Sequence, residues 1–324
     1  MYAPSFSTIA FWFALAPSAI ASTGFVKPVW GKSRFESLIR EGAFSDRSGL
    51  VSTIDKSRSA FMLISCPSQS GKTAMLSMLK AYYDPENSRD KKVLFASLNV
   101  GAEQHDPGRE FGKHPVIDLS FRNIDRASFA GFQLSFSGKI HDLFRNFKMA
   151  LDSSTKIPTE DRKKYQEIAQ NLVNRSAEQA GMDFVFLTGL LERHYGQVAN
   201  SREVIVLLDD YDNPASDASD DFVGTDVAAF LTRFFEVALK DNRSVYRVVF
   251  AGGEDRYKML KPLGIVSRIS VDSPHKAYCG LTEQQAKDMG AEEEELKKIP
   301  KLSTEPVVYR LKETIDILSH TSRD

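Results

Sequence analysis

The chain has 324 residues with 42 basic and 43 acidic side chains, so its formal net charge of −1 offers no basic tract, and we predict no nucleic-acid partner. That length suits one large domain or two small ones, and 42% apolar residues, 22 of them phenylalanine, are ample for a core. Two cysteines, Cys66 and Cys279, are too few for a disulfide framework, and no histidine or cysteine spacing indicates structural zinc.

The first 21 residues resemble a secretory signal peptide. Ile9 to Ala21 is almost wholly apolar, and Ala19-Ile20-Ala21 is a small-x-small cleavage pattern. The apolar run is shorter than the roughly 20 residues that span a bilayer, and no later segment is apolar enough to span one, so we predict no membrane span after cleavage. We therefore expect a secreted protein that begins at Ser22, with a linker over residues 22–34. The alternative is an uncleaved N-terminal helix that is buried or lies at an interface.

From residue 35 onward, apolar runs of strand length alternate with patterns of helical period. Continuous apolar runs are typical of strands buried on both faces of a parallel sheet. The expected strands are 60–66, 115–121, 204–208 and 246–251. The expected helices are 35–40, 73–83, 129–147, 160–180, 184–195, 221–239 and one that begins at Thr282, with Gln285 placed for a capping box; 91–112 is polar and irregular. This alternation predicts an α/β fold in which helices flank a parallel sheet.

The segment from Cys66 to Thr73, CPSQSGKT, follows a predicted strand and opens a predicted helix, which is the setting that a phosphate-binding P-loop requires. Backbone N–H groups of such a loop point at phosphate oxygens, and Gly71 lets the backbone approach them closely. Lys72 can reach the β- and γ-phosphates, and the Thr73 hydroxyl can bind Mg²⁺. Cys66 stands where GxxxxGK[ST] has its first glycine. The predicted nucleotide-binding residues are Pro67, Ser68, Gln69, Ser70, Gly71, Lys72 and Thr73.

The strand 204–208 runs directly into Asp209-Asp210-Tyr211-Asp212, which is a Walker B pattern. Asp209 would hold the Mg²⁺, since such sites lie outside the carboxyl ends of parallel strands. Asp210 is the candidate catalytic residue, because many ATPases carry there a glutamate that polarises the attacking water. Aspartate is one methylene shorter, and a displacement of about 1 Å can cost on the order of 10²-fold in rate. The alternative role for Asp210 and Asp212 is a solvated loop.

In this order the motifs resemble the AAA-ATPase-like family of P-loop proteins, whose members pair RPRRFGKT with a downstream IDEYD. The resemblance covers roughly residues 35–296, and it implies that the nucleotide is ATP, bound with Mg²⁺. It also implies a P-loop core over 35–280, followed by a small helical lid and C-terminal tail over 281–324. The matching segments are Phe44–Ser48, Pro67 with Gly71–Thr73, Leu76–Leu79, Pro115–Phe121, Tyr195-Gly196, Leu208–Pro214 and Gly280–Gln284.

The chain also departs from the family pattern around the loop. The two loop arginines of the family are Ser68 and Gln69 here, and its loop phenylalanine is Ser70. The Walker B glutamate is Asp210, and Gly252 replaces a threonine that could help to place the attacking water. These changes predict that nucleotide binding persists while hydrolysis is slow or lost. Many members carry a C-terminal nuclease-like domain, which we expect to be absent because the chain stops at Asp324.

Three functions remain open at this point. The first is an exported ATP-binding protein with weak or lost hydrolysis, which acts on an unidentified protein partner; ATP is scarce outside cells, so it would be delivered into another cell. The second is an active Mg²⁺-dependent ATPase that uses Asp210, and the third is a small-molecule phosphotransferase. A GTPase is disfavoured because the sequence has no NKxD or TKxD motif. Arg256 and Arg268 could contact a γ-phosphate, or they could be solvated at the surface.

Overall fold

The computed structural model describes most of the chain beyond the predicted signal peptide, which lies outside the described residues together with nearly all of the predicted linker and Gln69. The described residues are 34–41, 44–68, 70–86, 88–102, 110–196, 203–216, 222–253, 256–270, 273–288, 292–298, 301–304 and 307–309.

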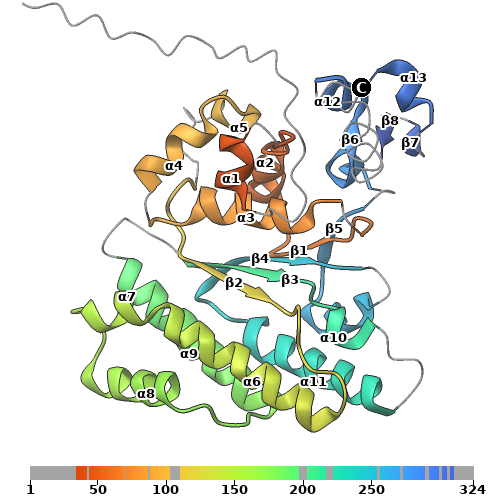
Figure 1. Cartoon of the computed structure of the whole chain (residues 1–324). Coiled ribbons are helices and arrows are strands. Elements are labelled where there is room, and N and C mark those ends of the chain that lie inside the picture. Colours follow the sequence, from red (N-terminus) through yellow and green to blue (C-terminus); the bar gives the residue numbers. More distant parts are fainter. Residues whose placement is uncertain are drawn as a thin grey trace, which may run out of the picture.

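A five-stranded parallel sheet lies at the centre of the structure (Figure 1). Its strands lie in the order β2-β3-β4-β1-β5, and their bounds are β1 Phe61–Ile64, β2 Val116–Ser120, β3 Val204–Asp209, β4 Val245–Ala251 and β5 Val266–Ile269. The register pairs Ala251 with both Ile64 and Asp209, so the carboxyl ends of β1, β4 and β3 are level. The chain that follows each of these strands therefore emerges at the same edge of the sheet.

Helices cover both faces of this sheet (Figure 1). One face carries α1 Phe35–Arg40, α2 Gly49–Lys56, α3 Lys72–Tyr83, α4 Ser88–Phe95 and α5 Asn99–Ala102. The other face carries α6 Phe129–Asn146, α7 Lys148–Ser153, α8 Thr159–Gln170, α9 Ala177–Tyr195, α10 Asn213–Ser216 and α11 Phe222–Leu239. Two 3₁₀ helices, η1 Tyr257–Leu263 and η2 Lys276–Cys279, flank β5 in the chain. The predicted α/β fold with a helix-flanked parallel sheet is confirmed.

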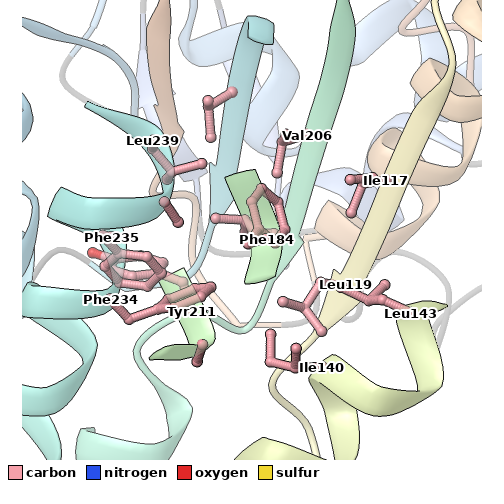
Figure 2. Close-up of a cluster of buried hydrophobic side chains, with 14 of the residues drawn as sticks. Ile117, Leu119, Ile140, Leu143, Phe184, Val206, Tyr211, Phe234, Phe235 and Leu239 are labelled. Atoms are coloured by element: carbon pink, nitrogen blue, oxygen red, sulfur yellow. The ribbon is translucent and has the colours of Figure 1, made fainter. Parts of the chain in front are cut away.

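The alternation of side chains along the strands explains why two cores form. In β3 all six residues are buried; Val204, Val206 and Leu208 face the α6–α11 side, whereas Ile205 and Leu207 face α3. Successive side chains of a strand point to opposite faces, so an unbroken apolar run supplies both cores. Figure 2 shows the core on the α6–α11 side, where Ile140 and Leu143 of α6 lie near Leu119 of β2, and Phe234 and Phe235 of α11 lie near Tyr211.

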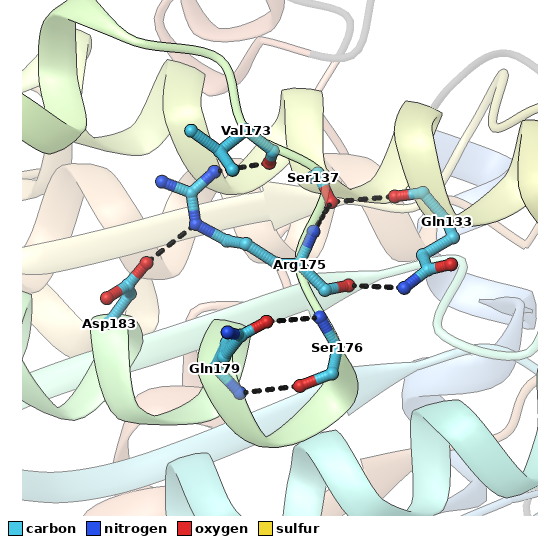
Figure 3. Close-up of polar contacts among 7 residues, drawn as sticks. All are labelled: Gln133, Ser137, Val173, Arg175, Ser176, Gln179 and Asp183. Atoms are coloured by element: carbon cyan, nitrogen blue, oxygen red, sulfur yellow. Dashed lines mark hydrogen bonds and ion pairs between the residues drawn. The ribbon is translucent and has the colours of Figure 1, made fainter.

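The boundary between α8 and α9 differs from the sequence-based expectation. We expected helix over 160–180 and 184–195, but α8 ends at Gln170 and α9 runs unbroken from Ala177 to Tyr195. Ser176 and Gln179 form a reciprocal capping box, which starts α9 there (Figure 3). The preceding residue, Arg175, is buried, and its side chain donates to Asp183 at 2.6 Å. The Ser-x-x-Gln spacing of this capping box is present in the sequence, but the helical periodicity continues through it, so the start of α9 was not predicted there.

The C-terminal part of the described chain forms a small unit beyond β5, on the side of the sheet that carries α1–α5 (Figure 1). Its elements are β6 Leu281–Thr282, α12 Glu283–Asp288, α13 Glu293–Leu296, β7 Lys301–Thr304 and β8 Val307–Tyr309. The expected capping box is confirmed, because Thr282 and Gln285 each accept a hydrogen bond from the other's backbone N–H, at 3.3 and 2.9 Å. The antiparallel sheet β6-β8-β7 was not anticipated where we expected a helical lid. Among the described helices, none is long and apolar enough to cross a membrane.

Candidate functional site

The loop between β1 and α3 has the backbone geometry that close contact with an anion requires. Gly71 has φ 84° and ψ 22°, a left-handed conformation that glycine adopts without steric cost. Lys72 begins α3 directly after it, and no side chain caps the start of this 12-residue helix. The first N–H groups of a helix have no partner within the helix, and together with the helix dipole they favour a bound anion.

The Lys72 ammonium lies across the mouth of this loop. Its Nζ donates to the carbonyl oxygens of Cys66 at 2.8 Å and Pro67 at 3.0 Å. A lysine ammonium has three donors, so one is left for a phosphate oxygen. Burial lowers the pKa of Lys72, and the nearby carboxylates of Asp210, Asp212 and Asp209 oppose that shift.

Thr73 and Asp209 meet at the carboxyl edge of the sheet, as the sequence predicted. The Thr73 hydroxyl donates to Asp209 Oδ2 at 2.8 Å, and Asp209 Oδ1 is buried with no hydrogen-bond partner among the described residues. Burial, followed by the charge of Asp210, raises the pKa of Asp209. A buried carboxylate oxygen without a partner is costly unless a cation or donor meets it. A hydroxyl and a carboxylate are ligands that suit Mg²⁺, which takes its other ligands from phosphate and water.

A cavity of about 350 Å³ opens beside these two side chains. It is lined by Thr73, Leu76, Ser77 and Lys80 of α3, by Asp118 and Asp209 at the sheet, and by Arg34, Glu36 and Lys91. The space is of the size that small-molecule sites occupy. A second cavity, of about 490 Å³, lies between α2 and β5 and contains no residue of the loop, so size alone does not single out the site.

Asp210 pairs with an arginine that follows the neighbouring strand β2. The Asp210 backbone is left-handed, with φ 52°, which is uncommon for a residue other than glycine. The Arg122 guanidinium at the end of β2 reaches Asp210 Oδ2 through both Nε and Nη2 at 2.9 Å. The Asp210 carboxylate is therefore already engaged by a cation, in an ion pair that is partly exposed.

Asp212 has a structural partner of its own. Its Oδ2 accepts the N–H of Gly253 at 2.8 Å, and the Tyr211 hydroxyl donates to the Gly253 carbonyl at 2.9 Å. These bonds fasten the segment after β3 to the segment after β4. The space at Gly252 is consumed as a result: a Cβ built there would lie 2.2 Å from Asp212 Oδ1 and 2.6 Å from a ring carbon of Tyr211. A side chain at position 252 would therefore meet Asp212 and Tyr211 unless these side chains shift.

Two features of the loop were missed in the sequence. Cys66, its first residue, forms a disulfide with Cys279, which is 213 positions away. The buried Arg47 donates from Nη1 to the Ser70 carbonyl and from Nη2 to the Gly280 carbonyl at 3.0 Å, and burial lowers its pKa to about 10. An even number of cysteines behind a predicted signal peptide was a signal for the disulfide. Arg47 carried no such signal, because its role depends on a segment more than 200 residues away.

The structure thus brings Lys72, Thr73 and Asp209 together at the carboxyl edge of the sheet, with Pro67, Ser68, Ser70 and Gly71 in the adjoining loop. Asp210 belongs to a different contact, and Gln69 lies outside the described residues. The Arg268 guanidinium stacks on the Tyr257 ring, 3.7 Å from its centroid, and Arg256 immediately precedes η1.

A parallel sheet with a glycine-containing loop after β1 and an aspartate at the carboxyl end of β3 is a P-loop-like α/β fold. The family model described as AAA-ATPase-like, Predicted AAA-ATPase, matches residues 29–255, more than half of the chain. The chain therefore belongs to this family, and membership implies nucleotide binding. No curated protein and no solved structure gives a significant match.

Proposed function

We propose that the chain binds ATP with Mg²⁺ at the loop 66–73 and hydrolyses it slowly or not at all. The observation that carries this proposal is the pair formed by Thr73 and Asp209, 2.8 Å apart, with the second oxygen of Asp209 buried and unpaired. Both side chains flank a loop whose lysine already lies over its mouth. Family membership supports the same assignment.

Each side chain has a separate task in binding. The N–H groups at the start of α3 receive the phosphates, and Lys72 donates to their oxygens. Thr73 and Asp209 would hold the Mg²⁺, which in such sites bridges two phosphates and neutralises their charge. Arg47 keeps the Ser70 carbonyl paired, so the loop retains its shape around the ligand.

Three features support slow hydrolysis. Asp210 is paired with Arg122, so its carboxylate is not free to accept a proton from water. Gly252 has no hydroxyl, and its neighbours leave no space for one. Ser68 stands in place of a loop arginine of the family pattern, so a cation that could stabilise the transferring phosphate is missing from the loop. Catalysis of phosphoryl transfer is mostly positioning and electrostatics, so these losses act on the rate rather than on binding.

Replacing Lys72 with alanine tests the proposed binding. We expect Lys72→Ala to weaken Mg-ATP binding by about 10- to 100-fold, because a hydrogen bond from a charged donor contributes about 1.5–3 kcal/mol. Isothermal calorimetry on the full chain measures this. Lys163→Ala is the matched control, since Lys163 is exposed on α8, where it pairs with Glu160. Equal Mg-ATP affinity of wild type and Lys72→Ala, or no binding by the folded wild type, would contradict the proposed binding and leave the loop with a structural role only.

Replacing Asp210 distinguishes a slow ATPase from an active one. We expect Asp210→Ala to change steady phosphate release by less than about threefold, because Arg122 already engages the carboxylate, whereas loss of a working general base costs about 10²–10⁴-fold. A coupled phosphate assay in the presence of Mg²⁺ measures the rate. A drop of 100-fold or more would establish Asp210 as the water-polarising residue and favour the active Mg²⁺-dependent ATPase. A small-molecule phosphotransferase has no specific support in the structure.

We also propose that the protein is exported and acts as a nucleotide-dependent interaction module for a protein partner, in a second cell that supplies ATP. Two observations support export: the apolar segment 9–21 with its cleavage pattern, and the disulfide, since disulfides persist in oxidising compartments. Mass spectrometry of the culture medium tests it, with a mature N-terminus at Ser22 as the expected result. A chain with an intact N-terminus that is found only inside the producing cell would contradict export.

A further inference from the structure

The first residue of the loop is covalently joined to the small C-terminal unit. Cys66 lies at the carboxyl end of β1, and its disulfide partner Cys279 ends η2, two residues before β6 begins. Both cysteines are buried, with 2% and none of their surface exposed. Residues 29–255 match the family model, so the bond ties that region to a segment outside the match.

Polar contacts run parallel to this bond. Arg47 bridges the Ser70 carbonyl of the loop and the Gly280 carbonyl next to Cys279. Gln285 of α12 donates to the Asp46 carbonyl at 2.9 Å. The C-terminal unit therefore keeps non-covalent contacts with the core if the disulfide is opened, whereas Cys66 itself loses its covalent anchor.

A short chain of contacts leads from the disulfide to Lys72, which we propose binds the phosphates. The Cys66 carbonyl is one of the two acceptors that hold the Lys72 ammonium, the other being the adjoining carbonyl of Pro67. The disulfide fixes the residue that carries the first acceptor. When that residue gains freedom, the lysine loses its fixed position over the phosphates, and ordering the loop on binding then costs conformational entropy.

We propose that the Cys66–Cys279 disulfide is a redox switch for the nucleotide site: the oxidised chain binds Mg-ATP tightly, and reduction by a dithiol weakens binding. The inference rests on the proposed function and adds a regulation of that site. One thiolate of the dithiol attacks a sulfur of the disulfide, which releases one cysteine and forms a mixed disulfide; the second thiol of the reagent then attacks its own sulfur in that mixed disulfide and releases the other cysteine. Two electrons and two protons pass to Cys66 and Cys279, which become thiols, while the dithiol becomes a cyclic disulfide.

Thermodynamic linkage requires that bound Mg-ATP also affects how readily the disulfide is reduced. If reduction weakens binding tenfold, saturating Mg-ATP must stabilise the oxidised form tenfold, because the two effects share one coupling free energy. For a two-electron couple, a tenfold change corresponds to about 30 mV, so bound nucleotide lowers the reduction potential by that amount. Bound nucleotide also slows reduction, because the buried sulfurs become accessible only when the loop opens.

The experiment compares Mg-ATP affinity of the full chain before and after treatment with dithiothreitol, with thiol titration to confirm two free cysteines. We expect the dissociation constant to rise at least tenfold on reduction, and the midpoint potential to fall by about 30 mV in saturating Mg-ATP. The double variant Cys66→Ser/Cys279→Ser should bind Mg-ATP as weakly as the reduced wild type does, and dithiothreitol should not change its dissociation constant. Reduced wild type gives the same answer if that variant does not fold.

Two outcomes separate this inference from the function on which it rests. Equal affinity of oxidised and fully reduced wild type, with the potential unmoved by Mg-ATP, overturns the switch and leaves the proposed binding intact. Binding by neither redox form overturns the proposed function and the switch with it.

Discussion

Asp209→Asn is expected to raise the free energy of unfolding of the ligand-free chain by about 1 kcal/mol and to weaken Mg-ATP binding by about 10- to 100-fold. The two effects share one cause. A buried carboxylate with an unpaired oxygen, next to the charge of Asp210, is unfavourable until a cation binds. Asparagine removes the charge and keeps an oxygen that can accept from Thr73, but it is a poor ligand for Mg²⁺.

The pH dependence follows from the direction of the shift. Burial and Asp210 raise the pKa of Asp209 in the folded state above its unfolded value. Such a group favours the folded state while it is protonated, and that contribution is lost as pH rises through the folded pKa. The stability gain of Asp209→Asn should therefore be largest at neutral pH and vanish on acidification. For the same reason, Mg²⁺-dependent binding by the wild type should weaken at a higher pH than an ordinary aspartate would give.

Urea unfolding at several pH values and calorimetry with Mg-ATP measure the two effects on one set of samples. Asp142→Asn is the control, because Asp142 lies on the exposed side of α6 with 63% of its side chain accessible. If Asp209→Asn destabilises the ligand-free chain, or if it binds Mg-ATP as tightly as wild type, Asp209 is a structural residue and not a metal ligand.

The sheet could be predicted from the sequence to the extent that each strand is a continuous apolar run. The four predicted strands are mainly apolar, and the wholly apolar run 204–208 coincides with β3 up to the final aspartate. The edge strand β5 was missed, because Ser267 and Arg268 interrupt its apolar pattern. An edge strand has one neighbour and partly exposed side chains, so its sequence carries less hydrophobic signal.

For the candidate site, distance in sequence decides which features could be predicted. Loop, lysine, threonine and Walker B aspartate could be predicted, because each belongs to a short local motif with a fixed chemical role. Partnerships across the fold could not: Arg122 and Asp210 are 88 residues apart, and Arg47 and Gly280 are 233 apart. The pairing of Arg122 with Asp210 depends on strand order, which places the end of β2 beside the end of β3. The sequence indicated the residue types but not which of them would meet.

Gly252→Ala is expected to lower the free energy of unfolding by about 1–3 kcal/mol, the usual cost of forcing an extra methyl group into a packed site. The added Cβ would lie 2.2 Å from Asp212 Oδ1, which can rotate away, but also 2.6 and 2.7 Å from two ring carbons of Tyr211. That ring is fully buried against Phe235 and Phe250, so it has little freedom to move. Threonine, the family residue, is larger and should cost more.

Gly138→Ala provides the matched control for this substitution, because the two changes add the same methyl group in opposite surroundings. Gly138 lies inside α6, and a Cβ there meets no atom within 4 Å. Alanine should therefore stabilise the chain by about 0.5–1 kcal/mol through its helix propensity. Thermal and urea unfolding of both variants measure the contrast. If Gly252→Ala is neutral, Tyr211 and Asp212 can yield, and restoring the threonine becomes a practical route to faster hydrolysis. If it is destabilising, the packing between the segments after β3 and β4 excludes a side chain at position 252, which supports the proposed slow hydrolysis.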